Sequence, residues 1–293
     1  MQIERVWPPK WGQGRRLEFI DFRLLWDGRV NRSDLTNFFG ISVPQASMDL
    51  ALYQQMASKN LIYDKQQRAY IPTAEFSPVL ASSDSLSFLN QIRQVEARLL
   101  PKGSTFLGWY PPAGVVRPPL RSVSASVLRL VLDAIRSGQV LRVFYQSMNR
   151  DNPSYRNIGP HAIVFDGMRW HVRAYCFEHR DFRDFVMARI LECDKTDGSG
   201  IDPSKDDCWR TMVTVKVTTA PHLTTGQKRA IALEYGMDHY RLSIPARKAL
   251  LLYLLKQLPI VTNEPSSKHN HLRIENKSEI RRHLKDMGVE VPV

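Results

Sequence analysis

Residues 163–177, near the middle of the chain, combine a tight-turn signal with side chains that could bind an anion. Asp166-Gly167 predicts a two-residue hairpin turn, because glycine readily adopts the positive φ angle that such turns need. Side chains alternate between the two faces of a strand. One face after the turn would therefore carry Arg169, His171, Arg173 and Tyr175. The other would carry Met168, Trp170, Val172 and Ala174, which makes Trp170 a predicted core residue.

A second alternating run follows at residues 183–190, with Arg183 and Arg189 in one phase. If the two strands pair in a suitable register, one face of the sheet carries several cations and a histidine. Guanidinium groups form paired hydrogen bonds with phosphate oxygens, so the pattern predicts a site for a phosphate-like anion. The alternative for each arginine is a solvated strand face that binds no ligand.

The overall charge favours a polyanionic partner. The 293 residues include 41 Lys and Arg against 29 Asp and Glu, which gives a net charge of +12 and an isoelectric point near 9.8. Such a balance is typical of proteins that bind nucleic acid, and the alternative is a basic soluble protein with no such partner. The length allows two or three domains.

The cysteine spacing and the lack of long apolar runs indicate where in the cell the protein acts. Cys176, Cys193 and Cys208 are odd in number and lack C-x-x-C spacing, which fits neither a disulfide framework nor a zinc ribbon. The first residues contain no apolar signal core, and no apolar run approaches the ~20 residues of a membrane span. We therefore expect a cytoplasmic, nucleoid-associated protein with no membrane partner, no metal and no cofactor.

The first 75 residues have the element order of a winged helix-turn-helix. Helices are predicted at 16–27, at 32–39 with Asn31 or Ser33 as N-cap, and from 43 to about 58, where Ser42 and Gln45 form a capping-box pattern. A basic hairpin follows at 61–71. The third helix would bury Ala46, Leu50 and Tyr53 and present its N-terminal end to bases. The predicted DNA contacts are Arg32, Ser42, Gln45, Ser47, Met48, Lys65 and Arg68. A three-helix protein-interaction module is the alternative.

The remaining chain predicts an α+β multidomain protein. A helix at 83–100 and a Pro-rich arm at 101–121 precede a helix at 122–137. Strands at 140–145, 157–165, 168–177 and 182–191 would form a small barrel or a strongly curled antiparallel sheet. A polar break at 195–203 leads to a strand at 212–218, helices at 225–235 and 245–257, a strand at 271–274 and a helix at 277–287. The domains expected are 1–75, 76–121, 122–200 and 201–293.

With these residues in place, nearly the whole chain resembles the WYL-domain transcription regulators. The naming tripeptide appears as Trp170-His171-Val172, with histidine where tyrosine is usual. The preceding strand ends in Tyr145 with Ser147 after it, Arg156 precedes the Pro160 segment, and Arg189-Ile190 closes the motif. The arrangement looks most like the homodimeric repressors encoded beside BREX and CBASS phage-defence systems.

The resemblance implies an Sm-like or SH3-like β-barrel at 122–200 with a pocket that senses a nucleotide or nucleic-acid effector. The residues expected to line this pocket are Tyr145, Ser147, Arg156, His171, Arg173 and Arg189. The resemblance also implies a C-terminal dimerisation domain at 201–293.

The leading hypothesis is a homodimeric repressor that binds a palindromic operator in double-stranded DNA and senses a ligand through the WYL domain. The helix at 83–100 would assist the dimer contact. An RNA- or single-stranded-DNA-binding accessory protein is a second hypothesis. A nuclease or nucleotide-processing enzyme is the third, and the sequence disfavours it because clustered carboxylates, a P-loop and nucleophile motifs are not found. We therefore predict no catalytic residues.

Overall fold

The computed structural model describes residues 11–117, 119, 121–200, 202–260 and 270–289. The chain forms two compact units, Met1–Pro118 and Pro119–Val293. Within the described residues, no helix combines the length and the apolar character that crossing a membrane requires.

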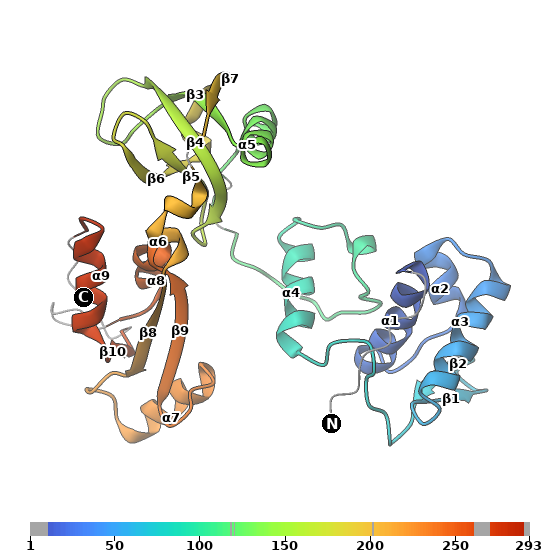
Figure 1. Cartoon of the computed structure of the whole chain (residues 1–293). Coiled ribbons are helices and arrows are strands. Elements are labelled where there is room, and N and C mark those ends of the chain that lie inside the picture. The colour runs from blue at the N-terminus through green and yellow to red at the C-terminus, as the bar shows by residue number, and fades with distance from the viewer. Residues whose placement is uncertain (1–10, 118, 120, 201, 261–269, 290–293) are drawn as a thin grey trace. The chain divides into compact units, whose positions relative to one another are not determined.

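The first unit contains the helices and the hairpin of the predicted winged helix (Figure 1). Its elements are α1 (Trp11–Trp26), α2 (Arg32–Phe39), α3 (Val43–Met56), β1 (Leu61–Asp64), β2 (Ala69–Pro72) and α4 (Ser85–Glu96). Asn31 is the N-cap of α2 and forms a capping box with Asp34, and Gly40 ends that helix at a φ of 64°. The predicted core positions Ala46, Leu50 and Tyr53 are all buried.

A buried carboxylate holds the segment after the hairpin against α1. Asp21 is fully buried, and its Oδ2 accepts hydrogen bonds from the backbone N–H groups of Val79 (2.8 Å), Leu80 (2.6 Å) and Ala81 (2.8 Å). Its Oδ1 accepts a hydrogen bond from the Tyr53 hydroxyl of α3. One side chain therefore joins α1, α3 and the approach to α4, with its charge balanced by four donors.

The second unit begins with α5 (Ala125–Ser137) packed on a five-stranded antiparallel sheet, as Figure 1 shows. The strands are β3 (Gln139–Tyr145), β4 (Ser154–Phe165), β5 (Trp170–Cys176), β6 (Asp181–Val186) and β7 (Ile190–Ser199), in the order β6-β5-β4-β3-β7. This order describes an open sheet, so the expected closed barrel is not supported. β6 and β7 are consecutive in the chain but lie at opposite edges, and no ladder joins them in the described ranges.

Two sequence expectations for this sheet are wrong. Trp170 is 45% exposed rather than buried, because it opens β5 and its ring packs at 4.9 Å on Phe165, the last residue of β4, at the end of the hairpin. The polar run after residue 195 continues the sheet instead of breaking it. Gln139 pairs with Ser199, since backbone pairing needs no apolar side chain at an exposed edge.

The C-terminal part of the second unit is a three-stranded antiparallel sheet with helices, in the strand order β10-β8-β9. Its elements are α6 (Asp207–Arg210), β8 (Met212–Thr219), α7 (Thr225–Glu234), β9 (Arg241–Arg247), α8 (Leu251–Gln257), β10 (Leu272–Ile274) and α9 (Lys277–Asp286). The helix predicted from residue 245 starts only at Leu251. Pro245 belongs to β9 opposite Thr214, which an edge strand tolerates because proline lacks only the N–H group.

Candidate functional site

The N-terminal half of α3 presents an uncharged surface to solvent. Ser42 caps the helix by accepting a hydrogen bond from the Gln45 backbone N–H (3.4 Å), and Pro44 occupies the first turn. Met48 is 66% exposed, and Ser47 is half-buried with its hydroxyl donating to the Val43 carbonyl (3.0 Å). A helix end of this kind fits the major groove, where its first residues reach base edges.

The Gln45 side chain is held in one direction by the core. Its Nε2 donates to Asp49 Oδ1 (3.1 Å) instead of returning to the helix start, so the second half of the predicted capping box is wrong. Asp49 is fully buried, and it accepts from Arg16 Nε at 2.6 Å. Because the Gln45 amide keeps one N–H and its oxygen free of Asp49, it can still pair with the two edge groups of an adenine.

A hollow of about 300 Å³ lies between the start of α2 and the hairpin. Arg32 and Arg68, both predicted phosphate contacts, line it together with residues that the sequence analysis missed: Asn31, Ser33, Tyr63 and Tyr70. Two guanidinium groups in one hollow suit a DNA phosphate. The start of α2 itself is already occupied by the Asn31–Asp34 capping box. Lys65 is exposed on the hairpin turn beside this hollow.

The predicted basic face of the second unit is divided between the two sides of its sheet. Ala174 pairs with Arg183, and Arg173 pairs with Asp184, so Arg173 and Arg183 point to opposite faces. Arg156 pairs with Val143 of the α5 side and is buried there. Arg173 shares the face of His171 as expected, but Arg156 and Arg183 lie on the opposite face, so the expected single basic face is wrong.

Arg156 and Tyr145 lie together on the α5 side. The guanidinium carbon of Arg156 is 5.8 Å from the Tyr145 ring centroid, and the Tyr145 hydroxyl accepts from the Val186 N–H (3.2 Å). Arg156 Nε is buried and has no hydrogen-bond partner among the described residues. A different atom of the same group, Nη1, lies 3.9 Å from Oε2 of the exposed Glu178 side chain, which is a long ion pair. A buried donor without a partner is costly, so this guanidinium is available to an anion.

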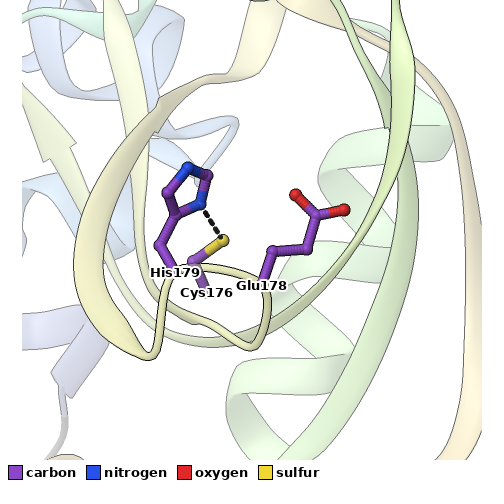
Figure 2. A group of neighbouring side chains, drawn as sticks. All are labelled: Cys176, Glu178 and His179. Carbon is purple, nitrogen blue, oxygen red and sulfur yellow. Dashed lines mark hydrogen bonds between the residues drawn. The ribbon is translucent and has the colours of Figure 1, made fainter.

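The turn after β5 brings a thiol, an imidazole and a carboxylate beside Arg156. Figure 2 shows Cys176, Glu178 and His179 on this turn, with Cys176 Sγ hydrogen-bonded to His179 Nδ1 at 3.2 Å. Their ligand atoms lie within 4.8 Å of one another, a donor set that zinc can use. Burial lowers the pKa of His179, and so do the charges of Arg183, Arg156 and Arg150. Those cations repel a metal dication and attract an anion.

The other predicted pocket residues have different surroundings. Ser147 accepts from the Asn149 N–H (3.2 Å) in the loop after β3, and the Arg189 carbonyl accepts from the Gln146 N–H (3.1 Å). Ser147 and Arg189 therefore lie next to Tyr145, at the ends of β3 and β6. Arg189 is half-buried.

His171 and Arg173 face the C-terminal part of the unit. Burial lowers the pKa of His171, although Asp166 and Asp184 oppose that shift. Its ring lies 5.2 Å from the Tyr253 ring of α8. Arg173 is bound to carboxylates on two sides, and His171 faces Asp166 and Asp184, so the negative charges on this side of the sheet disfavour an incoming anion. Nothing in the local sequence indicates these partners.

Comparisons with known proteins agree with the order of elements. Three family models match: the BrxR transcriptional regulator winged helix-turn-helix domain at residues 12–94, the WYL domain at 126–194, and the BrxR transcriptional regulator C-terminal dimerization domain at 212–280.

Curated relatives match over almost the full length. The DNA-binding transcriptional repressor CapW of Stenotrophomonas maltophilia is 40% identical over 282 residues, covering 94% of each chain. The CapW repressor of Pseudomonas aeruginosa is 43% identical, covering 93% of this chain and 92% of its own. That of Escherichia coli strain KTE188 is 40% identical, covering 94% and 93%. The chain therefore belongs to the family of CapW transcriptional repressors, with a BrxR-type winged helix, a WYL domain and a BrxR-type dimerization domain.

Proposed function

We propose that this protein is a homodimeric, sequence-specific transcriptional repressor that binds a palindromic operator in double-stranded DNA. The observation that carries the proposal is the exposed start of α3, where a hydrogen bond to buried Asp49 fixes the Gln45 amide on the helix surface. Family membership and the net charge of +12 support it. The protein would act in the cytoplasm on the nucleoid, as a regulator rather than an enzyme. Its resemblance to repressors of BREX and CBASS systems favours a phage-defence operon as its target.

The contacts divide into two classes. Gln45, Ser47 and Met48 would meet base edges, with Ser42 at the helix start, whereas Arg32, Arg68 and Lys65 would meet phosphates. A dimer places two such helices on the two arms of a palindrome, which gives specificity that a single winged helix lacks. The domain at 201–293 would hold the dimer, assisted by α4, whose Leu86 and Leu89 are 65% and 55% exposed.

Selection of duplex DNA from a random pool tests the proposal. The wild-type protein should enrich a two-fold symmetric sequence. Gln45→Ala should lower affinity for that duplex by roughly 1–3 kcal/mol and relax the preference at one position in each arm. A Gln45→Ala, Ser47→Ala protein that binds the selected duplex as well as the wild type contradicts the placement of the recognition surface.

We further propose that the WYL domain binds a phosphate-bearing effector, a nucleotide or short oligonucleotide, on the α5 side of its sheet. Arg156 would be the central contact, with Tyr145, Ser147 and Arg189 at the strand ends, His179 at the turn after β5 and Arg183 on β6. The supporting observation is the buried, unpartnered Arg156 Nε within a group of cations. An effector regulates only if it binds one state of the dimer better than the other.

Calorimetry with nucleotides and short oligonucleotides tests the effector site. Arg156→Ala and Arg189→Ala should retain operator binding and lose the effect of the ligand on it. Arg169→Ala is the matched control, since Arg169 pairs with Asp166 on the hairpin and lies outside this group. The sensing role fails if no phosphorylated compound binds the wild type, or if both variants respond unchanged.

One observation favours a second function, binding of single-stranded nucleic acid. On the outer face of β3 and β4, Arg142 lies 4.1 Å from the Tyr155 ring centroid, and Tyr155 lies 4.7 Å from the Phe144 ring centroid. Stacked aromatic and guanidinium groups are the surface on which unpaired bases bind. Titration of duplex and single-stranded DNA of equal length, each over a salt series, separates the two functions.

A further inference from the structure

A buried polar cluster joins the WYL sheet to the C-terminal part of the second unit. Arg173 Nε donates to Asp206 Oδ2 at 2.7 Å, its second terminal nitrogen donates to Asp206 Oδ1 at 3.0 Å, and its other nitrogen reaches Asp184 Oδ1 at 3.3 Å. His161 Nε2 lies 3.0 Å from Asp206 Oδ2, and the Tyr253 hydroxyl donates to Asp184 Oδ2 at 3.0 Å. We name these five residues the junction cluster.

Each carboxylate of the junction cluster is tied to an element on the far side. Asp206 is 1% exposed and is the N-cap of α6, accepting from the Trp209 N–H at 3.0 Å. Burial alone would raise the pKa of Asp206, but hydrogen bonds from His161 and Arg173 outweigh it and hold that pKa far below its usual range. Arg247 of β9 lies over the Trp209 ring and donates to its carbonyl at 2.6 Å. Asp206 is therefore linked, through Trp209 of α6 and Arg247 of β9, to the C-terminal sheet.

The junction is not closed by apolar packing. A cleft of about 540 Å³, open to solvent, adjoins the cluster and is lined from both sides, by Phe182 and Asp184 of β6 and by Leu252 and Tyr253 of α8. Buried ion clusters add little net stability, but their geometry selects one arrangement over others. A polar contact beside an open cleft can therefore be exchanged for another arrangement without disrupting either core.

One strand connects this junction with the proposed effector site. Arg183 of β6 faces the α5 side, where the effector would bind, and the next residue, Asp184, faces the opposite side and holds both Arg173 and Tyr253. β6 is an edge strand, paired with β5 alone. An anion that displaces Arg183 would therefore displace Asp184 with it.

We propose that the junction cluster is a latch that sets the orientation of the WYL domain on the dimerization domain, and hence the spacing of the two winged helices. The proposal rests on the dimeric repressor function proposed above. The closed cluster fixes one arrangement of the two domains, and we assign operator binding to that latched arrangement. Opening the latch weakens binding to the full palindrome and leaves each winged helix unchanged.

The test compares binding of the full protein to the selected palindrome and to a duplex that carries one arm. Asp206→Asn removes the charge while keeping a capping side chain, and Tyr253→Phe removes only the hydroxyl. Matched controls are Asp202→Asn, in the exposed turn of the same segment, and Tyr240→Phe, on the surface of the same domain. Both latch variants should bind the palindrome about tenfold more weakly, with single-arm binding within about twofold of the wild type, a factor of ten being 1.4 kcal/mol.

Hydrogen exchange provides a readout that does not depend on DNA. Asp206→Asn should speed exchange of the α6 amides, and Tyr253→Phe should speed exchange in α8, while the controls match the wild type. A change confined to the palindrome supports the latch. An unchanged affinity ratio, a loss shared equally by both duplexes, or unchanged exchange overturns it. If the wild type selects no symmetric duplex, the proposed repressor function is wrong. In that case faster hydrogen exchange in α6 of Asp206→Asn and in α8 of Tyr253→Phe would still support the junction contacts, so the two failures can be told apart.

Discussion

Removal of one cation from the α2 hollow should change how operator binding depends on salt. Arg32 and Arg68 line that hollow, and Lys65 lies on the adjacent turn. Three such cations on each of two copies give about six phosphate contacts, and each contact contributes about −0.9 to the slope of log K against log salt concentration. The whole group would then contribute a slope of about −5.

Arg68→Ala removes one contact from each copy, so the slope should become shallower by about 1.8. Raising salt from about 50 to about 200 mM then weakens the wild type by about twelvefold more than the variant. Fluorescence anisotropy on the selected duplex at four salt concentrations measures this directly. Lys59→Ala is the charge-matched control, because Lys59 is exposed in the turn between α3 and β1 and already pairs with Glu75 at 2.8 Å. Equal slopes for Arg68→Ala and the wild type refute the reasoning, as does an equal change in the control.

Four further results are expected. Asp49→Asn breaks the buried pair with Arg16 and the support of Gln45, so it should lower the free energy of unfolding by about 3 kcal/mol in urea melts. It should also reduce discrimination between operator and mismatched duplexes. A variant that stays stable and fully selective contradicts this. Burial lowers the pKa of His171, so the unfolded chain binds that proton more readily and stability falls as pH drops below about 6.5, by at most about 1.4 kcal/mol per unit. Urea melts at several pH values should show a flatter dependence in His171→Tyr, and an identical dependence would count against it. Tyr53→Phe should lower the free energy of unfolding by about 1–3 kcal/mol because Asp21 loses a buried donor, and a melt matching the wild type would count against that account. A chain ending at residue 203 should scatter light as a monomer, whereas a dimer of full strength places the interface outside the C-terminal domain.

Local signals in the sequence were sufficient for the winged helix. Asn31 with Asp34, Ser42 before Pro44, and Gly40 each act through neighbouring backbone groups, and all of them lie where the sequence predicts helix ends. The buried positions of α3 also follow from helical spacing alone. The Gln45 contact with Asp49 was missed because an aspartate on a helix is usually exposed, and the Arg16 partner of buried Asp49 lies on another helix.

The sheet face could not be predicted because strand register depends on distant residues. A shift of one residue exchanges every side chain between the faces, and the pairing of Ala174 with Arg183 separates the two sets of arginines. Pro245 begins no helix because β9 is an edge strand, a fact known only from the sheet order. No spacing rule links Arg173 to Asp206, since the segment that carries Asp206 returns to β5 only in the folded chain.

The support of Gln45 by Asp49 has a consequence for how operators change during evolution. A substitution at Asp49 removes both the support of Gln45 and a buried ion pair with Arg16, so it loses stability together with recognition. Met48, Ala51 and Gln55 are exposed on α3. After a gene duplication, the two copies would therefore acquire different operator preferences first through substitutions at these positions. The Arg16, Gln45 and Asp49 set would be retained as a unit.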